Sequence, residues 1–335
     1  MEHCNRFESC CDNRFSIQKL GNSLRIESDP VLRLRRVLFG TVLFLVAIDA
    51  IWAPLAHFRV DYGRYTELAL LSLLLLGGSQ FYQSKRPDPR LSAMLFGAGF
   101  LCLFSAAASV LNYCLLTVAG GRIDLTLAAI DRSLGFNWPA LMIAMAPHTF
   151  VTAALFAAYN SALPQIALLL CALGFTPSYV AIYRFCIATS VGALVCIITW
   201  SVAPSFGAIS VYGVPAAASH MQLALDQNYA QILINLLAHG PGFISPVDVK
   251  GLIGFPSYHT VLALLTIYYC WPLKLLRWPV LLLNVLVLAA TPIQGGHHLV
   301  DVLAGVPVTA LGLFAAGEWR KRPGIPAIED AQAAA

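Results

Sequence analysis

The chain has 335 residues, of which 58% are hydrophobic and 11% charged, and its mean hydropathy is +0.72. Soluble globular domains carry about 25% charged residues, so this composition excludes a soluble enzyme, a disordered chain and a disulfide scaffold. The net charge of +4 does not indicate a nucleic-acid partner, because in a membrane protein the placement of charge matters more than its sum. We therefore expect an all-α polytopic membrane protein.

Apolar runs long enough to cross a bilayer recur along the chain, and each needs about 20 residues. They predict about eight transmembrane helices, at 37–56, 66–83, 91–118, 148–174, 178–203, 257–272, 279–294 and 298–316. The chain then divides into an N-terminal tail (1–36), N-terminal transmembrane helices (37–118), a second membrane domain (119–316) and a C-terminal tail (317–335).

Clusters of arginine and lysine predict the orientation of these helices. They lie at 33–36, 85–90, 274–277 and 320–322, and the positive-inside rule places all four, and both tails, in the cytoplasm. An even number of spans must then separate the second cluster from the third, so residues 138–203 can hold two spans but not three. We therefore predict that 138–147 lies in the interface and that 148–174 forms one span bent at Pro164.

Residues 57–65 and 294–298 fall on the outer side in this topology, together with two long segments. Residues 119–147 contain an amphipathic stretch at 123–132, which predicts a short helix lying on the membrane. Residues 204–256 contain a second amphipathic stretch at 217–238. Because long loops are usually functional or disordered, and this one is too apolar for disorder, we expect it to fold over the membrane face as a lid or substrate rest.

The segment 295–305, Gly-Gly-His-His-Leu-Val-Asp-Val-Leu-Ala-Gly, opens the last predicted span at its outer end. His297 and Asp301 are four residues apart, so on a helix they share one face. A carboxylate that accepts the Nδ1–H of an imidazole leaves Nε2 free as a nucleophile or base. Gly296 allows close approach of a bulky anion, and the helix N-terminus offers N–H groups to a phosphate.

The segment 254–260, Gly-Phe-Pro-Ser-Tyr-His-Thr, opens an earlier span at the same face. Pro256 suits a first helical position, and Ser257 can offer its hydroxyl and N–H to the same anion. His259 and His297 are separated by two spans and a short turn, so both end at the outer face. Two histidines and one carboxylate at such a site predict phosphoryl transfer, in which one histidine attacks phosphorus and the other protonates the leaving oxygen.

Pro-Ser-x-His followed about forty residues later by Gly-His-x-x-x-Asp resembles the type 2 phosphatidic acid phosphatase (PAP2) superfamily. Within it, the chain is most similar to the inositolphosphotransferase branch, which includes fungal inositol phosphorylceramide synthase. Residues 131–138 and 159–165 also resemble bacterial members of that branch. The resemblance covers roughly 120–316 and implies a six-helix core, a location in the bacterial inner membrane and an active site that faces the periplasm.

The resemblance also implies roles for single residues. His297 would form a phosphohistidine, Asp301 would orient it, and His259 would be the general acid and later the base. Ser257 would help to hold the phosphoryl oxygens, as would Gly296, and His298 would be a secondary contact. The substrate would be a phospholipid or lipid phosphate, with a polyol as a possible acceptor. The chemistry requires no metal or other cofactor.

The chain departs from the phosphatases of the superfamily in its basic residues. It has no Lys-(six residues)-Arg-Pro motif before 257, since 200–205 reads Trp-Ser-Val-Ala-Pro-Ser, and Thr291 stands where those enzymes have arginine. The charge that develops on phosphorus needs a cation or an array of N–H groups. Candidates on the outer side are Lys250, the nearest in sequence, and Arg122, Arg132, Arg59 and Arg64.

The inositolphosphotransferase branch also lacks those basic motifs, which favours a lipid phosphotransferase over a plain lipid-phosphate phosphatase. A transporter or flippase is a further alternative. It is disfavoured because the sequence shows no internal repeat, and because the polar residues lie at helix ends rather than at mid-span. A catalytically dead scaffold is disfavoured because both histidines and the aspartate are intact.

Overall fold

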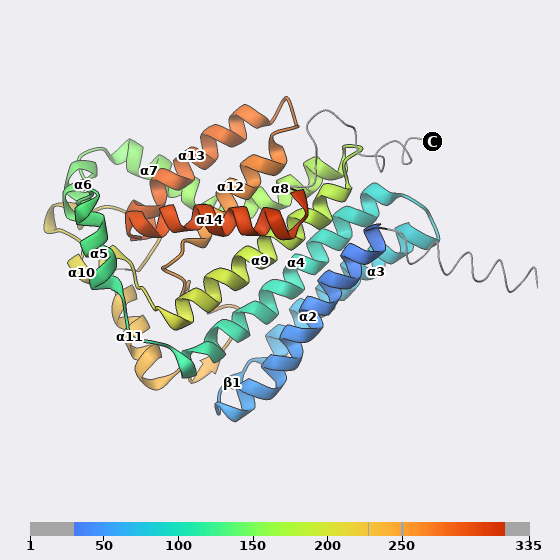
Figure 1. Ribbon diagram of the computed structural model, residues 1–335, viewed down its shortest axis with the longest axis horizontal. Helices are drawn as coiled ribbons and strands as arrows, with labels where there is room; N and C mark the ends of the chain where they lie inside the picture. Colours follow the sequence, from blue (N-terminus) through green and yellow to red (C-terminus); the bar gives the residue numbers. More distant parts are fainter. Residues whose placement is uncertain (1–29, 227, 249–250, 319–335) are drawn as a thin grey trace, which may run out of the picture.

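The computed structural model describes residues 30–226, 228–248 and 251–318. Almost all regular structure in this part of the chain is helical, and the two strands, β1 (Arg59–Val60) and β2 (Phe243–Ile244), have two residues each. Figure 1 shows long helices side by side, with shorter helices gathered at the left-hand end of the molecule. The expected all-α class is confirmed.

The first layer consists of four long helices, α2 (Pro30–Leu55), α3 (Tyr62–Ser84), α4 (Pro89–Cys114) and α9 (Val180–Val202). Asp61 caps the N-terminus of α3, and Asp88, followed by Pro89, caps that of α4. Small residues let these helices approach closely: a Cβ atom on Gly99 of α4 would lie 2.9 Å from the carbonyl oxygen of Ser72 in α3.

A cap of short elements covers one end of this layer. It contains η1 (Leu115–Val118), α5 (Asp124–Ser133), α6 (Trp138–Met145), α10 (Ala208–Tyr212), η2 (Ala216–Ala218) and α11 (Tyr229–His239). Strands β1 and β2 pair in parallel, and Ile123 N donates to Pro204 O at 3.0 Å. These contacts join 57–65, 119–147 and 204–256, the segments expected on one side of the membrane.

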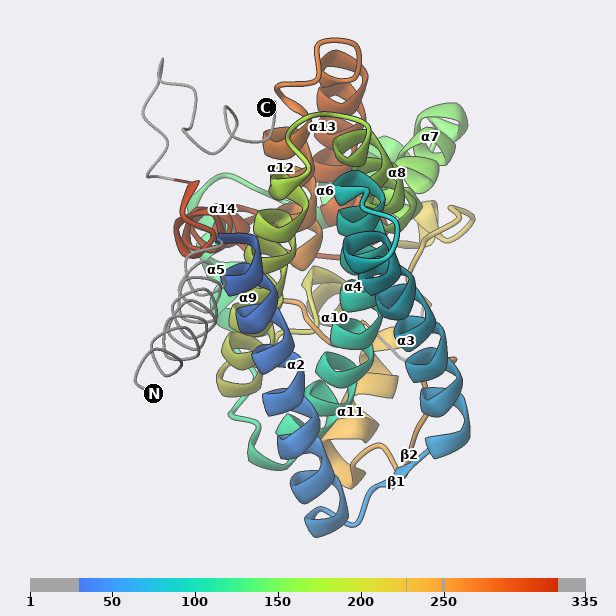
Figure 2. The same cartoon turned by 90° about the vertical axis from the view of Figure 1, so that its right-hand side faces the viewer.

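The second half of the chain adds α7 (Thr149–Asn160), α8 (Ala162–Gly174), α12 (Tyr258–Cys270), α13 (Arg277–Gln294) and α14 (Leu299–Ala315). Asn284 of α13 donates to Gln165 of α8 at 2.7 Å. Figure 2 views α14 nearly along its axis, whereas α2 and α9 run up the page. Helix α14 therefore crosses the long helices steeply, and a Cβ atom on its Gly312 would lie 2.6 Å from the carbonyl oxygen of Ala188 in α9.

In the described part of the chain, four helices are long and apolar enough to cross a membrane: α2, α4 with η1, α9 and α13. A fifth results if α6 and α7, which meet at a bend of 116°, form one broken span. Helices α8, α12 and α14 are apolar but have 13, 13 and 17 residues, fewer than the ~20 that a bilayer requires. The several apolar helices are compatible with a multi-pass membrane protein, but the predicted eight spans and six-helix core are not confirmed.

One of the predicted spans is broken. The span 148–174 is not bent at Pro164 but ends and restarts at Ser161, where α7 gives way to α8. In the amphipathic stretch 217–238, regular α-helix begins at Tyr229. The other two short segments do form helices: α5 covers most of 123–132, and α6 covers most of the interfacial segment 138–147.

The basic cluster at 33–36 lies inside α2, which begins before the predicted span. Arg35 is buried and donates to Gln83 of α3 and to Ser79, with its guanidinium carbon 4.6 Å from the centre of the Phe96 ring. This arginine therefore joins three helices in addition to any role in topology. The cluster at 320–322 lies outside the described residues.

Candidate functional site

The two histidine-containing segments meet where α12 and α14 begin. Ser257 N donates to the carbonyl oxygen of Asp301 at 3.0 Å. A Cβ atom on Gly305 of α14 would lie 2.7 Å from Thr260 Cγ2, so the helices are in close contact there. Ser257 is the N-cap of α12, and its Oγ accepts the Thr260 N–H at 3.4 Å. Pro256 therefore precedes the cap and does not occupy the predicted first helical position.

His297 and Asp301 form a buried pair. His297 Nδ1 lies 3.2 Å from Asp301 Oδ2, and the same oxygen accepts the His298 backbone N–H at 2.9 Å. The contact does not arise from a shared helical face, as the spacing predicts, because His297 precedes the N-cap of α14. Asp301 reaches back from the first turn instead. The pair holds the Nδ1–H tautomer of His297 and leaves Nε2 for chemistry.

His259, the second residue of α12, packs against a tyrosine that the sequence interpretation did not identify as functional. The rings of His259 and Tyr159 of α7 stack with centroids 4.1 Å apart and an angle of 20° between their planes. A Cβ atom on Gly295 would lie 2.7 Å from both Tyr159 OH and His297 Cδ2. The hydroxyl of Tyr159 thus lies close to His297, and the structure brings both histidines around this one ring.

Gly296 has a φ of +61°, and a Cβ atom there would lie 2.7 Å from Ile209 Cγ2. Gly207 has a φ of +78°, and its Cβ atom would lie 2.3 Å from the carbonyl oxygen of Gly296. L-residues rarely adopt such φ values, and both positions lack space for a side chain. The group that closely approaches Gly296 in the structure is therefore the loop that leads into α10. The backbone of this loop packs directly beside His297.

Asp131 of α5 caps the start of α14. Its carboxylate accepts the backbone N–H groups of Leu299 and Val300, each at 3.0 Å, and contacts His298 Nδ1 at 3.1 Å. The prediction that a phosphate binds these N–H groups is wrong, because a buried carboxylate of the chain already occupies them. A sequence signal for Asp131 existed, since it is a charged residue in the amphipathic stretch 123–132.

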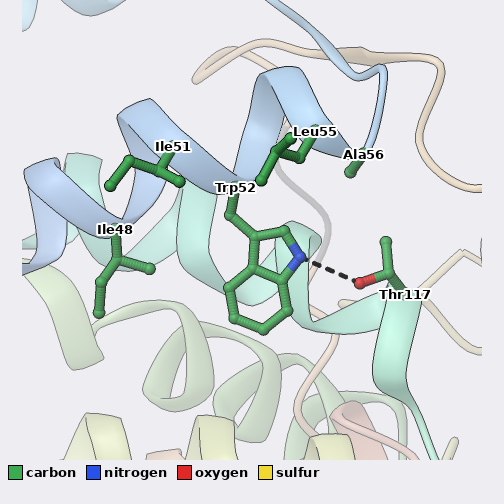
Figure 3. Close-up of a pocket in the computed structure, with 6 residues that line it drawn as sticks. All are labelled: Ile48, Ile51, Trp52, Leu55, Ala56 and Thr117. Atoms are coloured by element: carbon green, nitrogen blue, oxygen red, sulfur yellow. Dashed lines mark hydrogen bonds between the residues drawn. The ribbon is translucent and has the colours of Figure 1, made fainter.

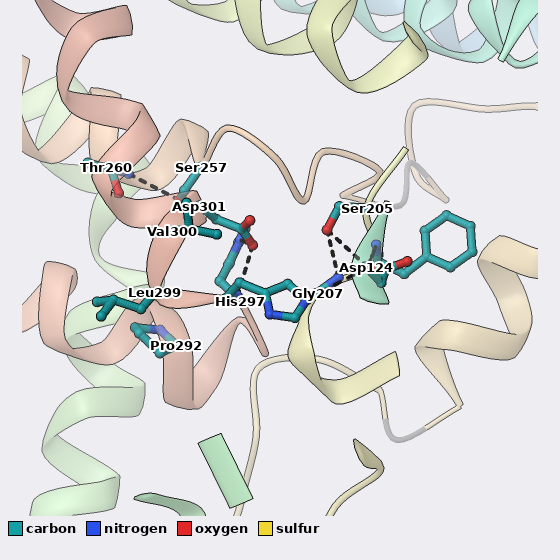
Figure 4. Close-up of polar contacts among 12 residues, drawn as sticks. Asp124, Ser205, Gly207, Ser257, Thr260, Pro292, His297, Leu299, Val300 and Asp301 are labelled. Atoms are coloured by element: carbon teal, nitrogen blue, oxygen red, sulfur yellow. Dashed lines mark hydrogen bonds and ion pairs between the residues drawn. The ribbon is translucent and has the colours of Figure 1, made fainter. Parts of the chain in front are cut away.

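Asp124, at the other end of α5, fixes the loop 205–207. Its Oδ1 accepts hydrogen bonds from Ser205 Oγ at 3.0 Å and from Phe206 N at 2.7 Å. Its Oδ2 accepts Arg122 Nε at 2.9 Å, and this guanidinium lies 4.2 Å from the centre of the Phe206 ring. Asp124 Oδ1 is also 4.0 Å from His298 Nε2. Figure 4 shows the His297–Asp301 pair between Ser257 and Asp124.

The candidate cations differ in their relation to this cluster. Arg64 forms an exposed ion pair with Glu67, and Arg132 donates to Tyr212 at 3.4 Å on the surface. Arg59 lies in β1, on the far side of the cap. Lys250 lies outside the described residues. Arg122 contacts Asp124, which in turn lies next to His298. Among the candidate cations that the structure describes, Arg122 is therefore the one connected to the histidines.

Three polar side-chain atoms at the site have no hydrogen-bond partner among the described residues, and all are buried: Asp301 Oδ1, His298 Nε2 and Thr260 Oγ1. Within the same ranges, no three His, Cys, Asp or Glu side chains are placed to hold a metal ion. Figure 3 shows a cavity of about 430 Å³ elsewhere, lined by the apolar residues of α2 around Trp52 and by Thr117. It contains no titratable group, so we place the site at the histidines.

Replacing Tyr159 with alanine is expected to lower kcat/KM by about twofold to tenfold, because an aromatic pair contributes about 0.5–1.5 kcal/mol. Tyr159→Phe keeps the stacked ring and should stay within about twofold of the wild type. The activity of both variants is measured by the release of labelled product from a lipid substrate. Phe150→Ala, at an exposed position at the start of the same helix, is the control. A loss in Tyr159→Phe as large as in Tyr159→Ala would instead assign the effect to the hydroxyl.

Comparison with known proteins places this arrangement in a family. The model of the PAP2 superfamily matches residues 125–315, which include all of α5 except its first residue, Asp124, and every element from there to α14. Neither the comparison with curated proteins nor that with solved structures gives a match. The family match extends over more than half of the chain and contains both histidine segments, so the protein belongs to the PAP2 superfamily.

Proposed function

We propose that this PAP2-superfamily phosphatase or phosphotransferase acts on a phospholipid or lipid phosphate through a phosphohistidine, and that it passes the phosphoryl group, with the headgroup where the donor carries one, to an alcohol acceptor. The observation that carries the proposal is the His297–Asp301 pair, at 3.2 Å, next to the Tyr159 ring on which His259 stacks. One histidine with a fixed tautomer and a second beside it are what a two-step transfer needs.

In the first step, His297 Nε2 attacks the phosphorus of the donor. A P–N bond forms, the P–O bond to the leaving alcohol breaks, and His259 gives its proton to that oxygen. Asp301 accepts the Nδ1–H and stabilises the positive charge that develops on the ring. Because Asp301 is fully buried, this interaction is screened little by water.

In the second step, the acceptor hydroxyl attacks the phosphohistidine. An O–P bond forms, the P–N bond breaks with its electron pair returning to His297 Nε2, and His259 takes the hydroxyl proton. Water in place of the alcohol gives hydrolysis, the reaction of a plain phosphatase. Transfer to an alcohol is supported by the absence of the phosphatase basic motifs at 200–205 and at Thr291.

The phosphoryl oxygens are held by groups around the start of α12. Ser257 Oγ accepts the Thr260 N–H as an N-cap, which leaves its own hydroxyl hydrogen to donate to phosphate. The backbone N–H of Gly296 is another donor that we assign. Lys250, which lies outside the described residues, is assigned the same role from its place in the sequence. Arg122, held by Asp124 and Phe206, supplies positive charge at the edge of the site.

Arg122→Gln is expected to lower kcat/KM by about tenfold to a hundredfold, less than the loss of a direct oxyanion contact. Arg122→Lys keeps the charge but cannot keep the paired contacts to Asp124, so it should fall between Gln and the wild type. Arg132→Gln, which removes another arginine from the cap surface, is the matched control for net charge. Equal losses in the Gln variants at 122 and 132 would show a general charge effect.

We place this site at the outer face of the membrane, which in a bacterial inner membrane is the periplasmic face. The segments 57–65, 119–147 and 204–256 contact one another in the cap that contains it. The basic residues at 85–90 and 274–277 occupy the turns between α3 and α4 and between α12 and α13, at the opposite ends of helices from the cap (Figure 1). Cysteine-accessibility mapping tests this, and a cytoplasmic 204–256 would contradict it.

The activity is tested with purified protein and phospholipids labelled in the headgroup phosphate, with and without polyols. We expect label on the protein that is stable to base but released by acid and, when the acceptor is present, a labelled product in which the transferred phosphoryl group or phospho-headgroup is joined to the polyol. Free phosphate or phospho-headgroup alone at every polyol concentration would indicate a plain phosphatase. Lipid that moves between leaflets without cleavage would indicate a transporter.

A further inference from the structure

The site contains a second histidine–carboxylate pair that the proposed mechanism does not use. His298 Nδ1 lies 3.1 Å from Asp131 Oδ2, close to the 3.2 Å of the His297–Asp301 pair. Asp131 also accepts two backbone N–H groups of α14, so its carboxylate is held in place beside the His298 ring. In the tautomer that directs Nδ1–H at Asp131, the Nε2 atom on the other side of the ring carries a lone pair.

The two neighbouring imidazoles are held in different parts of the site. Asp301, which binds His297, belongs to α14, whereas Asp131 belongs to α5. His298 Nε2 lies 4.0 Å from Asp124 Oδ1, at the side of the site formed by α5 and the loop 205–207. This side of the site adjoins the His297–Asp301 pair, because the His298 backbone N–H donates to Asp301 Oδ2 at 2.9 Å.

The chemistry of this side of the site selects hydroxyl donors. His298 is completely buried, and its Nε2 has no hydrogen-bond partner among the described residues. The lone pair of Nε2 and the carboxylate of Asp124 are both hydrogen-bond acceptors, so they repel phosphate oxygens. A hydroxyl group can donate to Nε2, and a buried acceptor left without a donor is costly.

We propose that His298 Nε2 accepts a hydrogen bond from a non-reacting hydroxyl of the acceptor, so that the protein favours a polyol over water or a monohydric alcohol. This inference rests on the proposed function. His298 undergoes no bond change in it: the reacting hydroxyl loses its proton to His259, while the second hydroxyl only donates to His298. His298, which the sequence analysis gave as a secondary contact of the phosphoryl group, is thereby assigned to binding of the acceptor.

Two substitutions separate the two ring nitrogens. In His298→Asn, the side-chain amide can replace the Nδ1–H donor to Asp131, but nothing replaces Nε2. In His298→Gln, the longer side chain places an amide oxygen near the Nε2 position. We expect His298→Asn to raise the KM for a cyclic polyol by about threefold to tenfold, the effect of one hydrogen bond, with a smaller rise in His298→Gln. His148→Asn, at an exposed histidine that begins α7, is the matched control.

The two half-reactions are measured separately. Formation of labelled phosphoenzyme from lipid without acceptor should be unchanged in His298→Asn, and the ratio of transfer to hydrolysis should fall. A slower formation with an unchanged KM for the polyol would overturn the inference and make His298 a phosphate contact or a structural residue. If the wild type forms no phosphoenzyme, it is the proposed function that fails.

A series of monodeoxy analogues of the cyclic polyol tests the same point without depending on how well the variants fold. With the wild type, removal of one particular hydroxyl should lower kcat/KM by about threefold to tenfold. In His298→Asn, that analogue should react as well as the parent polyol. If every deoxy analogue reacts like the parent with the wild type, no hydroxyl is recognised in this way and the inference is wrong.

Discussion

Replacement of His297 by alanine is expected to abolish both the covalent phosphoenzyme and turnover, because in the proposed mechanism His297 Nε2 is the atom that takes the phosphoryl group. His259→Ala is expected to slow both steps, since the leaving oxygen and the acceptor each lose a proton-transfer partner. It should still form a trace of phosphoenzyme from a donor whose leaving group does not need protonation. The two variants therefore separate the nucleophile from the acid.

Acid-labile radiolabel on the protein after mixing with labelled lipid is the measurement. Both histidines lie at helix N-termini rather than in the large apolar cluster around Phe96 and Tyr183, so we expect both variants to fold, which a thermal unfolding curve checks. His148→Ala, at an exposed histidine, is the control. Label trapped by His297→Ala but not by His259→Ala would reverse the two roles.

Asp301→Asn is expected to lower kcat by about 10²–10⁴, the range for loss of a positioned acid–base partner. In the wild type, Oδ2 of Asp301 accepts hydrogen bonds from His297 Nδ1 and from the His298 backbone N–H. An asparagine can keep the bond to the backbone with its oxygen, but it removes the negative charge that stabilises the imidazolium. The shape of the site is retained, so the loss should appear in kcat more than in the KM for lipid.

Rate constants for formation and breakdown of the phosphoenzyme show whether the loss falls on both steps, as expected when the nucleophile itself is affected. Glu67→Gln, an exposed carboxylate on α3, is the matched control. A change in thermal stability of Asp301→Asn with kcat preserved would show that Asp301 is needed to begin α14 and not to orient His297.

Hydropathy and spacing in the sequence were enough to predict the helical class, the position of most helices and the two histidine segments. The reason is that the cost of placing polar backbone in lipid forces apolar runs into helices wherever they occur. The number of spans was not accessible in this way. Whether 257–270 or 299–315 crosses a membrane depends on length and inclination, and the steep crossing of α14 over α9 follows from packing at Gly312.

At the site, too, some features could be predicted from the sequence and others depend on tertiary packing. The sequence by itself selected the candidates for the chemistry that we propose, because His259, His297 and Asp301 are ionisable groups at apolar helix ends, where such groups are costly and rare. The tertiary structure decided what surrounds them. Asp131 and Tyr159 are distant in the sequence from the residues that they contact, at 298–300 and 259. Such contacts depend on how α5 and α7 pack against α14 and α12, which no local pattern specifies.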